Sequence, residues 1–489
     1  MKEVRKPLGP KRIAVVVLAV IAVISLVISM IAGAIAVLSR ENRYAIGTQA
    51  THSPPTTAAS TPITSVSSPS PTTPTTTPPV RQHDLPSPVL ASAAPLVVPN
   101  NMAVTKKIRA IKVKGMTGSY SGSVIEVGTG KVLYAHNAAR PYIPASTMKL
   151  LTATAALSIL GPDHTFKTSV VSPQRGQIIL VGGGDPYLAR KGSADYPKRA
   201  TIIGLARETA TELKQDKITK VRLGYDASLF SGPAWNPRWP SFYGGDVSRT
   251  SALWVDEGRL GASIPRHKDP AREAAIAFSA ALSQQGIKVT TTQQVRAPKS
   301  APVVAAVSSM RLERIVEQVL MVSDNDAAEV LFRQAAIGAG KPGSIAEAIK
   351  VVQSELTELG IWAPGMTIND GSGLARQTKV PADAMVKMLR LAAGNERPEL
   401  RAVITGLPVA GVEGSLRVRF FDDQSLAGRG VVRGKTGTLN KVRALAGVVR
   451  TSDGSLLAYA FLINKPKNEF NAMVWLDRVT TAISTCGCR

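Results

Sequence analysis

Apolar and polar positions divide the chain into three stretches. From Ile13 to Leu38 the sequence carries no charge and is dominated by Val, Ile, Ala and Leu, which is long enough for a helix that crosses a bilayer. Between about Thr51 and Pro99 the sequence is rich in Thr, Pro and Ser, with few side chains able to form a core. Beyond this stretch, apolar positions recur at the spacings of strands and helices, which predicts a folded region.

The first stretch predicts a single-pass membrane anchor at residues 13–38, preceded by a cytoplasmic tail at 1–12. Five basic side chains precede it and place the rest of the chain outside the cytoplasm: Lys2, Arg5, Lys6, Lys11 and Arg12. A cleaved signal peptide is the alternative, since Ala32-Gly33-Ala34 could serve as a cleavage site, but the apolar stretch is longer than an ordinary signal core. Residues 39–100 are then a Thr/Pro/Ser-rich linker that holds the folded region away from the membrane.

Two separated regions predict the strands of one sheet. Near the start of the folded region, residues 121–127 and 131–136 form a predicted hairpin around Gly128-Thr129-Gly130. Near its end, three more strands are predicted at 431–439, 443–450 and 456–463, followed by an amphipathic helix. We therefore expect an α+β fold in which residues 101–165 and 301–489 together supply five strands and covering helices.

The residues between these regions predict an insertion. Residues 166–300 contain strand-like pieces at 177–181 and 221–225 and are too many for a loop, so we expect one or more accessory domains. Trp235 and Trp239 lie among prolines in this region. They could form a binding surface, although packing of a loop is the favoured interpretation.

A helical apolar pattern begins close to Ser146. The segment 141–145 disfavours a helix, and apolar residues then recur until Gly161-Pro162 ends the run. Serine is an ordinary N-cap, but a capping box would have Glu or Gln three residues later, and that position holds Lys149. The helix dipole and burial both favour a neutral amine there. One helical turn lets Lys149 reach the Ser146 hydroxyl and accept its proton.

Two further polar elements follow. Ser323-Asp324-Asn325 separates two helical patterns, and these residues are also usual in turns and caps. Lys435-Thr436-Gly437-Thr438 lies in the strand predicted at 431–439, where Gly434 and Gly437 let a ligand approach the backbone and Lys435 offers a charge to an anion. A plain edge strand with a solubilising lysine is the alternative.

In this order the three elements resemble the S-x-x-K, S-x-N and K-T-G motifs of the penicillin-recognising serine enzymes, which comprise penicillin-binding proteins and serine β-lactamases. The segments 180–188 and 370–374 resemble signatures of D-alanyl-D-alanine carboxypeptidases of the penicillin-binding protein 4 type. The resemblance extends from about Ser119 to the C-terminal helix. It implies a β-lactamase/DD-peptidase-like fold, in which the five predicted strands pair in one five-stranded antiparallel sheet, and a serine hydrolase that trims peptidoglycan stem peptides. The resemblance also implies that the enzyme needs no cofactor and is acylated by β-lactams.

The resemblance also implies the roles of the first two motifs. Lys149, held neutral partly by Lys435, takes the proton of Ser146 as that oxygen attacks the terminal D-Ala-D-Ala amide. Ser323 relays a proton to the leaving amine, and Asn325 binds the substrate amide.

The third motif and the backbone complete the site that the resemblance implies. Lys435, Thr436, Gly437 and Thr438 bind the substrate, with Lys435 and Thr436 at its terminal carboxylate. The backbone N–H groups of Ser146 and Thr438 form an oxyanion hole, in which one donor contributes about 3 kcal/mol.

Charge favours anionic partners. The chain has 59 Lys and Arg against 34 Asp and Glu, a formal net charge of +25. The export topology and the lack of an aromatic-interleaved basic motif argue against nucleic acid, so wall polymers and lipid headgroups fit better. Seven basic residues surround the third motif and are expected to attract a peptide carboxylate: Arg417, Arg419, Arg429, Arg433, Lys435, Lys441 and Arg443.

No metal site or histidine triad is predicted. Cys486 and Cys488 lie near the C-terminus with one residue between them, and we assign them no catalytic role. With the five histidines they form no four-ligand metal-binding pattern. No histidine stands in a nucleophile-elbow context, which leaves lysine as the better base.

Two rival functions remain open. A serine β-lactamase shares all three motifs but needs neither a membrane anchor nor a large insertion. A non-catalytic wall-binding protein would retain the motifs only as relics, and the intact Ser146, Lys149, Ser323, Asn325 and Lys435 argue against it. The sequence leaves the balance between carboxypeptidase and endopeptidase action open.

Overall fold

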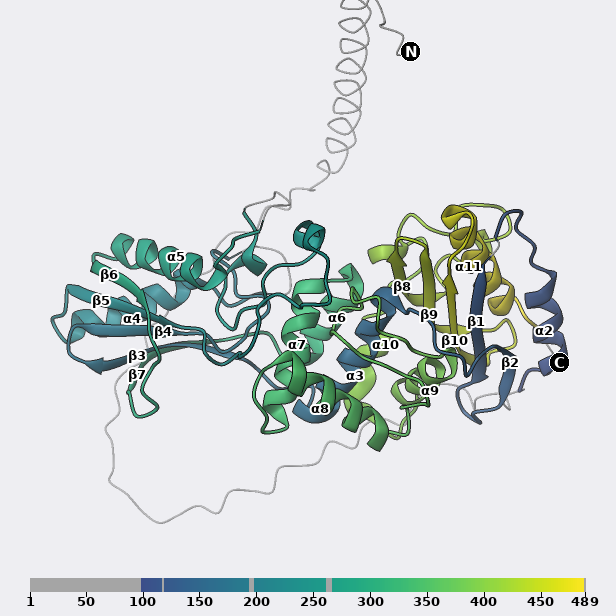
Figure 1. Cartoon of the computed structure of the whole chain (residues 1–489), viewed down its shortest axis with the longest axis horizontal. Helices are drawn as coiled ribbons and strands as arrows, with labels where there is room; N and C mark the ends of the chain where they lie inside the picture. Colours follow the sequence, from purple (N-terminus) through teal and green to yellow (C-terminus); the bar gives the residue numbers. More distant parts are fainter. Residues whose placement is uncertain (1–97, 117, 193–197, 261–265, 488–489) are drawn as a thin grey trace, which may run out of the picture. The chain divides into compact units, whose positions relative to one another are not determined.

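The computed structural model describes residues 98–116, 118–192, 198–260 and 266–487 of the chain (Figure 1). Among these residues, no helix is both long and apolar enough to cross a bilayer. The predicted tail at 1–12, the anchor at 13–38 and most of the linker at 39–100 lie outside the described residues, as does Cys488. These assignments stay predictions.

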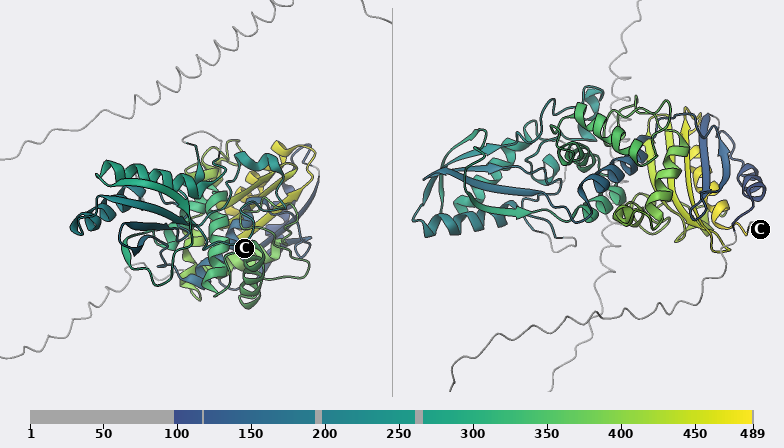
Figure 2. Two further views of the ribbon diagram at one scale, coloured as in Figure 1. Left: turned by 60° about the vertical axis from the view of Figure 1, so that its left-hand side comes forward. Right: turned by 90° about the horizontal axis from the view of Figure 1, so that it is seen from below.

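One sheet joins the two ends of the folded region. Its five strands are all antiparallel and run in the order β2-β1-β10-β9-β8. Their bounds are β1 (Ser119–Glu126), β2 (Val132–His136), β8 (Arg433–Leu439), β9 (Val442–Arg450) and β10 (Leu456–Asn464). In Figure 2 the blue strands from the start of this region lie beside the yellow strands from its end. The predicted five-stranded antiparallel sheet is confirmed.

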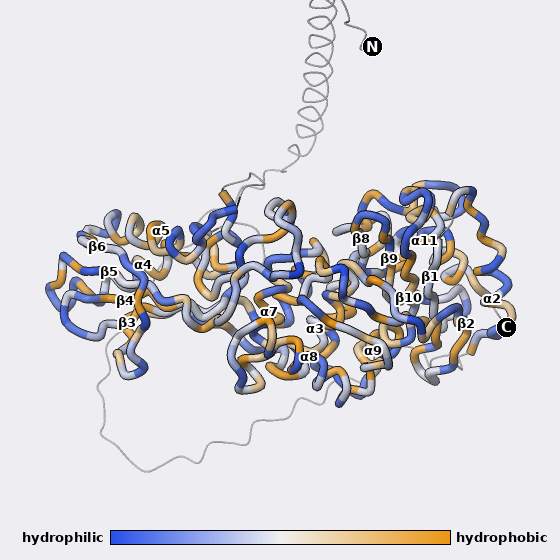
Figure 3. Tube along the Cα trace, viewed as in Figure 1, coloured by the Kyte–Doolittle hydropathy of each residue, from blue (hydrophilic) through white to orange (hydrophobic). Residues whose placement is uncertain are grey.

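Both faces of this sheet are buried, which follows from the alternation of side chains along its central strand. Leu457, Tyr459 and Phe461 of β10 pack with α2 (Asn101–Ala110) and α11 (Glu469–Ser484). The intervening Ala458 and Ala460 face the opposite helical layer, where small side chains let a helix approach closely. Figure 3 shows the resulting hydrophobic colouring along β9 and β10.

The opposite layer holds the helices that carry the first two motifs. They share one large core with the sheet. Their bounds are α3 (Met148–Leu160), α6 (Leu312–Val322), α7 (Asn325–Gly338), α8 (Ile345–Glu358), α9 (Ala382–Ala393) and α10 (Arg401–Thr405). Ten consecutive residues of α3, from Met148 to Leu157, are buried, so this helix is central and its first turn is fixed by packing on every side.

The insertion forms a second sheet with its own core. The strand order is β6-β5-β4-β3-β7, in which β4, β5 and β6 are parallel and β3 is antiparallel to both of its neighbours. Helices α4 (Ile202–Gln215) and α5 (Pro270–Gln284) share the core of this sheet. The strands are β3 (Lys167–Gln174), β4 (Gln177–Val181), β5 (Lys220–Asp226), β6 (Lys288–Gln294) and β7 (Val303–Ser308).

The second sheet continues beyond residue 300, where the insertion was predicted to end. Strand β7 begins at Val303 and pairs with β3, so the second sheet continues to Ser308. The short alternating pattern of β7 does not show which of two sheets it joins, because that depends on the pairing of distant backbone groups.

Candidate active site

Ser146 lies in a tight turn at the entrance to α3. A single 3₁₀ turn, Ala145–Thr147, precedes the helix, and Ser146 is not its N-cap. Two glycines from distant segments border this turn. A Cβ at Gly437 would come 2.5 Å from the Pro144 carbonyl oxygen, and one at Gly373 would overlap the Ala145 carbonyl oxygen. Glycine at these positions therefore allows the third motif and the 370–374 segment to pack against the serine turn.

Lys149 extends from the first turn of α3 into a fully buried site. Its side chain is 0% exposed. Nζ lies 3.1 Å from Ser146 Oγ and donates to Asn325 Oδ1 at 2.6 Å and to the Ser372 carbonyl oxygen at 2.9 Å. The predicted contact between Lys149 and Ser146 is present. Asn325 of the second motif also accepts a hydrogen bond from the same amine.

These three contacts determine where a neutral amine directs its lone pair. A neutral amine has two N–H bonds and one lone pair, and the two acceptors Asn325 Oδ1 and Ser372 O occupy both N–H bonds. The remaining neighbour is Ser146 Oγ. The lone pair of neutral Lys149 therefore faces the Ser146 hydroxyl, which is the geometry that proton transfer needs.

Burial favours that neutral state. Desolvation lowers the pKa of Lys149 to about 8, although the carboxyl groups of Asp324, Asp370 and Glu329 oppose this shift. Burial is the largest cause of the lowered pKa of Lys149. Burial, followed by the charge of Lys149, also holds the pKa of Lys435 well below its usual range. Because repulsion between two ammonium groups acts on both, the expectation that Lys435 helps to keep Lys149 neutral stays a prediction.

Two buried carboxyl groups hold the Ser372 carbonyl in place. Glu329 Oε1, on α7, accepts from the backbone N–H groups of Gly371 at 3.0 Å and Ser372 at 2.7 Å. Asp370 accepts from the N–H groups of Gly373 at 3.1 Å and Ala375 at 2.6 Å. The 370–375 turn is thus fixed on both sides, and with it the acceptor that orients Lys149.

The Glu329 contact predicts a stability effect. In Glu329→Ala, two buried N–H groups lose their acceptor, so we expect the free energy of unfolding to fall by about 2–4 kcal/mol. Urea unfolding followed by circular dichroism measures this. Glu329→Gln keeps a carbonyl acceptor and should lose less, and Glu358→Ala, at an exposed position on α8, is the control. Wild-type stability in Glu329→Ala would contradict the assignment.

The second and third motifs meet through Ser323 and Lys435. Ser323 ends α6 in a left-handed conformation, with φ 61° and ψ 40°, which is strained for a residue with a side chain. This conformation places Ser323 Oγ 2.7 Å from Lys435 Nζ, which donates to it. The predicted interhelical turn at Ser323-Asp324-Asn325 is present, with Asp324 as the N-cap of α7.

The rest of the third motif lies along β8. Thr436 Oγ1 donates to Ser415 Oγ at 2.9 Å, a neighbour that the sequence did not reveal. Thr438 is exposed and lines the same cleft as Ser146. Seven basic residues were predicted to attract a carboxylate to this motif, but two of them are already in ion pairs. Arg419 pairs with buried Asp477, and Arg443 pairs with Glu469 at 2.6 Å.

The insertion contributes one wall of the cleft. The cleft has a volume of about 700 Å³ and is lined by Ser146, Pro240, Phe242, Tyr243, Asp246, Asn325, Leu374, Arg376, Thr438, Leu439, Asn440, Arg443 and Glu469. Asn325 Nδ2 donates to the Asp246 carbonyl oxygen at 2.9 Å, and Trp239 Nε1 donates to Asp370 Oδ2 at 2.9 Å. Trp239 is therefore a packed loop residue that also secures the 370–375 turn.

The 180–188 segment attaches the insertion to α7. Gln334 Nε2 donates to the Gly183 carbonyl oxygen at 2.8 Å, and the Tyr187 hydroxyl donates to Asp324 Oδ2 at 3.2 Å. Three buried carboxyl groups gather behind this contact, at Glu257, Asp324 and Asp326, within 4.8 Å of one another. Arg259 contacts Glu257 and Asp326, and Arg266 contacts Asp326, so two of the three carboxyl groups are paired with guanidinium groups.

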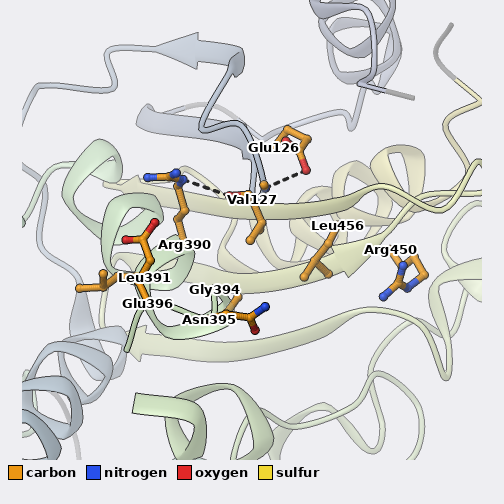
Figure 4. A pocket seen from close by; sticks show the side chains of 11 residues that line it. Glu126, Val127, Arg390, Leu391, Gly394, Asn395, Glu396, Arg450 and Leu456 are labelled. Carbon is orange, nitrogen blue, oxygen red and sulfur yellow. Dashed lines mark hydrogen bonds between the residues drawn. The ribbon is translucent and has the colours of Figure 1, made fainter. Parts of the chain in front are cut away.

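A second pocket, of about 450 Å³, lies around the end of β1 and the end of α9 (Figure 4). Its polar groups are already engaged: Arg390 Nε donates to the Val127 carbonyl oxygen at 3.0 Å, and Glu126 accepts from Gly128 N at 2.9 Å. No residue of the three motifs lines it. We assign it no ligand.

The fold and this geometry suit an acyl-transfer enzyme that would use a serine nucleophile and a lysine base. Comparison with known proteins narrows the class. The D-Ala-D-Ala carboxypeptidase 3 (S13) family matches residues 104–269 and 262–482. The chain is 32% identical over 426 residues to a carboxypeptidase of Mycobacterium tuberculosis, which covers 84% of this chain and 90% of that protein. It is 31% identical over 421 residues to carboxypeptidase DacB of Mycolicibacterium smegmatis, and the match covers 82% of this chain and 90% of that protein.

Solved structures agree on the fold. Penicillin binding protein 4 of Haemophilus influenzae superposes with a TM-score of 0.63 at 21% identity, covering 78% of this chain and 98% of that chain. The chain belongs to the D-Ala-D-Ala carboxypeptidase 3 (S13) family and is a serine-type hydrolase of that family. The predicted resemblance is confirmed at this level.

Proposed function

We propose that the enzyme removes the terminal D-alanine from peptidoglycan stem peptides through an acyl-enzyme on Ser146. The observation that carries this proposal is the buried Lys149 amine, which among the described residues hydrogen-bonds to two acceptors and to the Ser146 hydroxyl. Incubation with a muropeptide that ends in D-Ala-D-Ala tests it: stoichiometric release of D-alanine supports the proposal, and an intact substrate refutes it.

The first step is attack by Ser146. Lys149 takes the hydroxyl proton as Ser146 Oγ adds to the carbonyl carbon, and the backbone N–H groups of Ser146 and Thr438, which border one cleft, stabilise the oxyanion. The C–N bond then breaks, and the leaving amine receives a proton through Ser323. Ser323 suits this role because its oxygen already accepts from Lys435, which leaves its own proton free to be donated.

The third motif binds the end of the peptide. Lys435 and Thr436 attract the terminal carboxylate, with Gly437 leaving the strand edge open to it. Asn325 was expected to bind the substrate amide. Its Oδ1 instead accepts from Lys149 and its Nδ2 donates to Asp246 O, so its first role is to orient the base, and one Nδ2 hydrogen remains for substrate.

Water then hydrolyses the acyl-enzyme and releases the shortened peptide. Penicillins acylate Ser146 because they present the same carboxylate and amide. A cross-link that ends in a D-alanine amide has the same reacting bond, so endopeptidase action is a second reaction of this site. A serine β-lactamase would turn penicillin over rapidly, whereas here we expect a persistent adduct.

The enzyme works outside the cytoplasm in this proposal. The uncharged apolar stretch at 13–38 and the basic residues before it support a single-pass anchor in the cell membrane. The Thr/Pro/Ser-rich linker then gives the catalytic region reach into a wall polymer. Fractionation of cells that express the full chain, with and without residues 1–38, tests this location.

The lowered pKa of Lys149 predicts the pH dependence of acylation. The base is the neutral amine, and its pKa is lowered to about 8; the rate constant therefore rises with pH, by about tenfold for each unit well below 8, and levels off above it. Stopped-flow measurement of penicillin acylation from pH 6 to 9.5 checks this. A rate constant that is flat or falls across the range would contradict a titrating amine base.

A further inference from the structure

A cationic pocket lies beside the catalytic cleft and contains none of the motif residues. Its volume is about 340 Å³, and it is lined by Trp235, Ser241, Gly244, Val247, Arg249, Arg266, His267 and Lys268. Three of these eight residues are Arg or Lys, and no carboxyl group lines the pocket. Such a lining favours an anion.

Two of the charges are uncompensated. Arg249 and Lys268 are exposed, and neither forms an ion pair within the described part of the chain. His267 is only loosely paired, since its Nδ1 lies 3.8 Å from Glu273 Oε2. The positive potential of the pocket is therefore not cancelled by its immediate neighbours.

Arg266 adds donors that have no acceptor. Its side chain is 7% exposed, and Nη2 lies 3.0 Å from Asp326 Oδ2. Within the described part of the chain, its Nε and Nη1 are buried without a hydrogen-bond partner, which is unfavourable for a charged donor. An oxyanion that shifts the pocket wall slightly would supply the missing acceptors.

The carboxyl group behind Arg266 is shared among several donors. Asp326 also accepts from Ser248 N at 2.6 Å and lies 3.4 Å from Arg259 Nη2. Burial and the charge of Asp324 raise the pKa of Asp326 to about 6. Asp326 is thus shared between Arg266, Arg259 and Ser248 N, and part of the Arg266 guanidinium charge remains available.

One short segment separates this pocket from the cleft that holds Ser146. Ser241, Gly244 and Val247 line the pocket, whereas Phe242, Tyr243 and their neighbours in the same segment line the cleft. A group bound in the pocket therefore lies one loop away from the reacting bond. A polymer bound in the cleft could place an anionic substituent there.

We propose that this pocket is an oxyanion-binding subsite that holds a phosphate or carboxylate group of the wall polymer. The link to a wall polymer rests on the proposed function, whereas binding of the anion does not. Phosphoryl and carboxylate groups share the chemistry that Arg249, Arg266 and Lys268 recognise, which is charge-assisted hydrogen bonding to oxygen.

Isothermal titration calorimetry with inorganic phosphate and with acetate, at constant ionic strength set by chloride, tests the subsite. We expect one saturable site for at least one of the two anions, with affinity reduced roughly tenfold or more in the double variant Arg249→Gln/Lys268→Gln. The double variant Arg207→Gln/Lys214→Gln makes the same charge change on exposed α4 and should bind as wild type. The anion that binds more tightly identifies the group.

Two outcomes overturn the subsite: no saturable binding of either anion, or equal binding in the two double variants, which marks an adventitious ion only. Release of D-alanine from a short peptide should be unchanged in Arg249→Gln/Lys268→Gln, since neither side chain lines the cleft. Anion binding without any release of D-alanine by the wild type would refute the proposed function and leave the subsite intact.

Discussion

Ser146→Ala should abolish release of D-alanine from a muropeptide. The substitution removes the hydroxyl oxygen that the Lys149 lone pair faces and leaves the acyl-enzyme without a site of attachment. Loss of a catalytic nucleophile lowers kcat by roughly 10⁴-fold or more, which corresponds to about 5.5 kcal/mol of activation free energy. Chromatographic measurement of free D-alanine over time gives the rate.

The matched control for this variant is Ser452→Ala, an exposed serine in the turn between β9 and β10. It should release D-alanine at the wild-type rate. Because Ser146 is small and lies in a turn held by backbone contacts, its variant should also keep the wild-type unfolding temperature. Release of D-alanine by Ser146→Ala within tenfold of the wild type would show that another group attacks the substrate.

Lys149→Met should lower the rate constant of penicillin acylation by about 10²–10⁴-fold, the usual contribution of a general base. Methionine fills the buried space with an unbranched side chain but has no group that accepts a proton. Ser146 remains present, so acylation becomes slow rather than impossible. Stopped-flow mixing with a chromogenic β-lactam measures the rate constant.

Lys149→Met also removes the donor to Asn325 Oδ1 and Ser372 O, and a local rearrangement could lower the rate by itself. The pH profile separates the two effects. Loss of the base should remove the rise of the rate with pH towards about 8, whereas misplacement of Ser146 alone would leave that rise in place. Lys106→Met, at an exposed position on α2, should match the wild type.

Local patterns were sufficient for much of the fold and for the motif residues. The five strands of the first sheet were predicted to within a few residues, because turns at Gly128-Thr129-Gly130 and Ser452-Asp453-Gly454 mark the ends of four of them and β10 carries a continuous apolar run. The contact between Ser146 and Lys149 follows from helical spacing alone. The pairing of strands from opposite ends of the chain was expected from the family resemblance, since no local signal specifies it.

The surroundings of the site were not predictable in the same way. Glu329 looks like an ordinary helical glutamate, and only the fold brings it to the N–H groups of Gly371 and Ser372. Ser415 and Asp246 lie in irregular segments whose positions depend on long-range packing. Burial was expected to favour a neutral Lys149, but the buried carboxyl groups that oppose this shift come from distant segments and could not be derived from its neighbours in sequence.

Mass spectrometry of the penicillin adduct tests most directly whether Ser146 is the nucleophile. Wild-type protein is incubated with penicillin, its intact mass is followed over time, and the adduct is then located by peptide mapping. The account predicts one persistent penicillin-sized adduct per chain, on the peptide that contains Ser146, and none in Ser146→Ala. An adduct on another peptide, or the same adduct in Ser146→Ala, would contradict it.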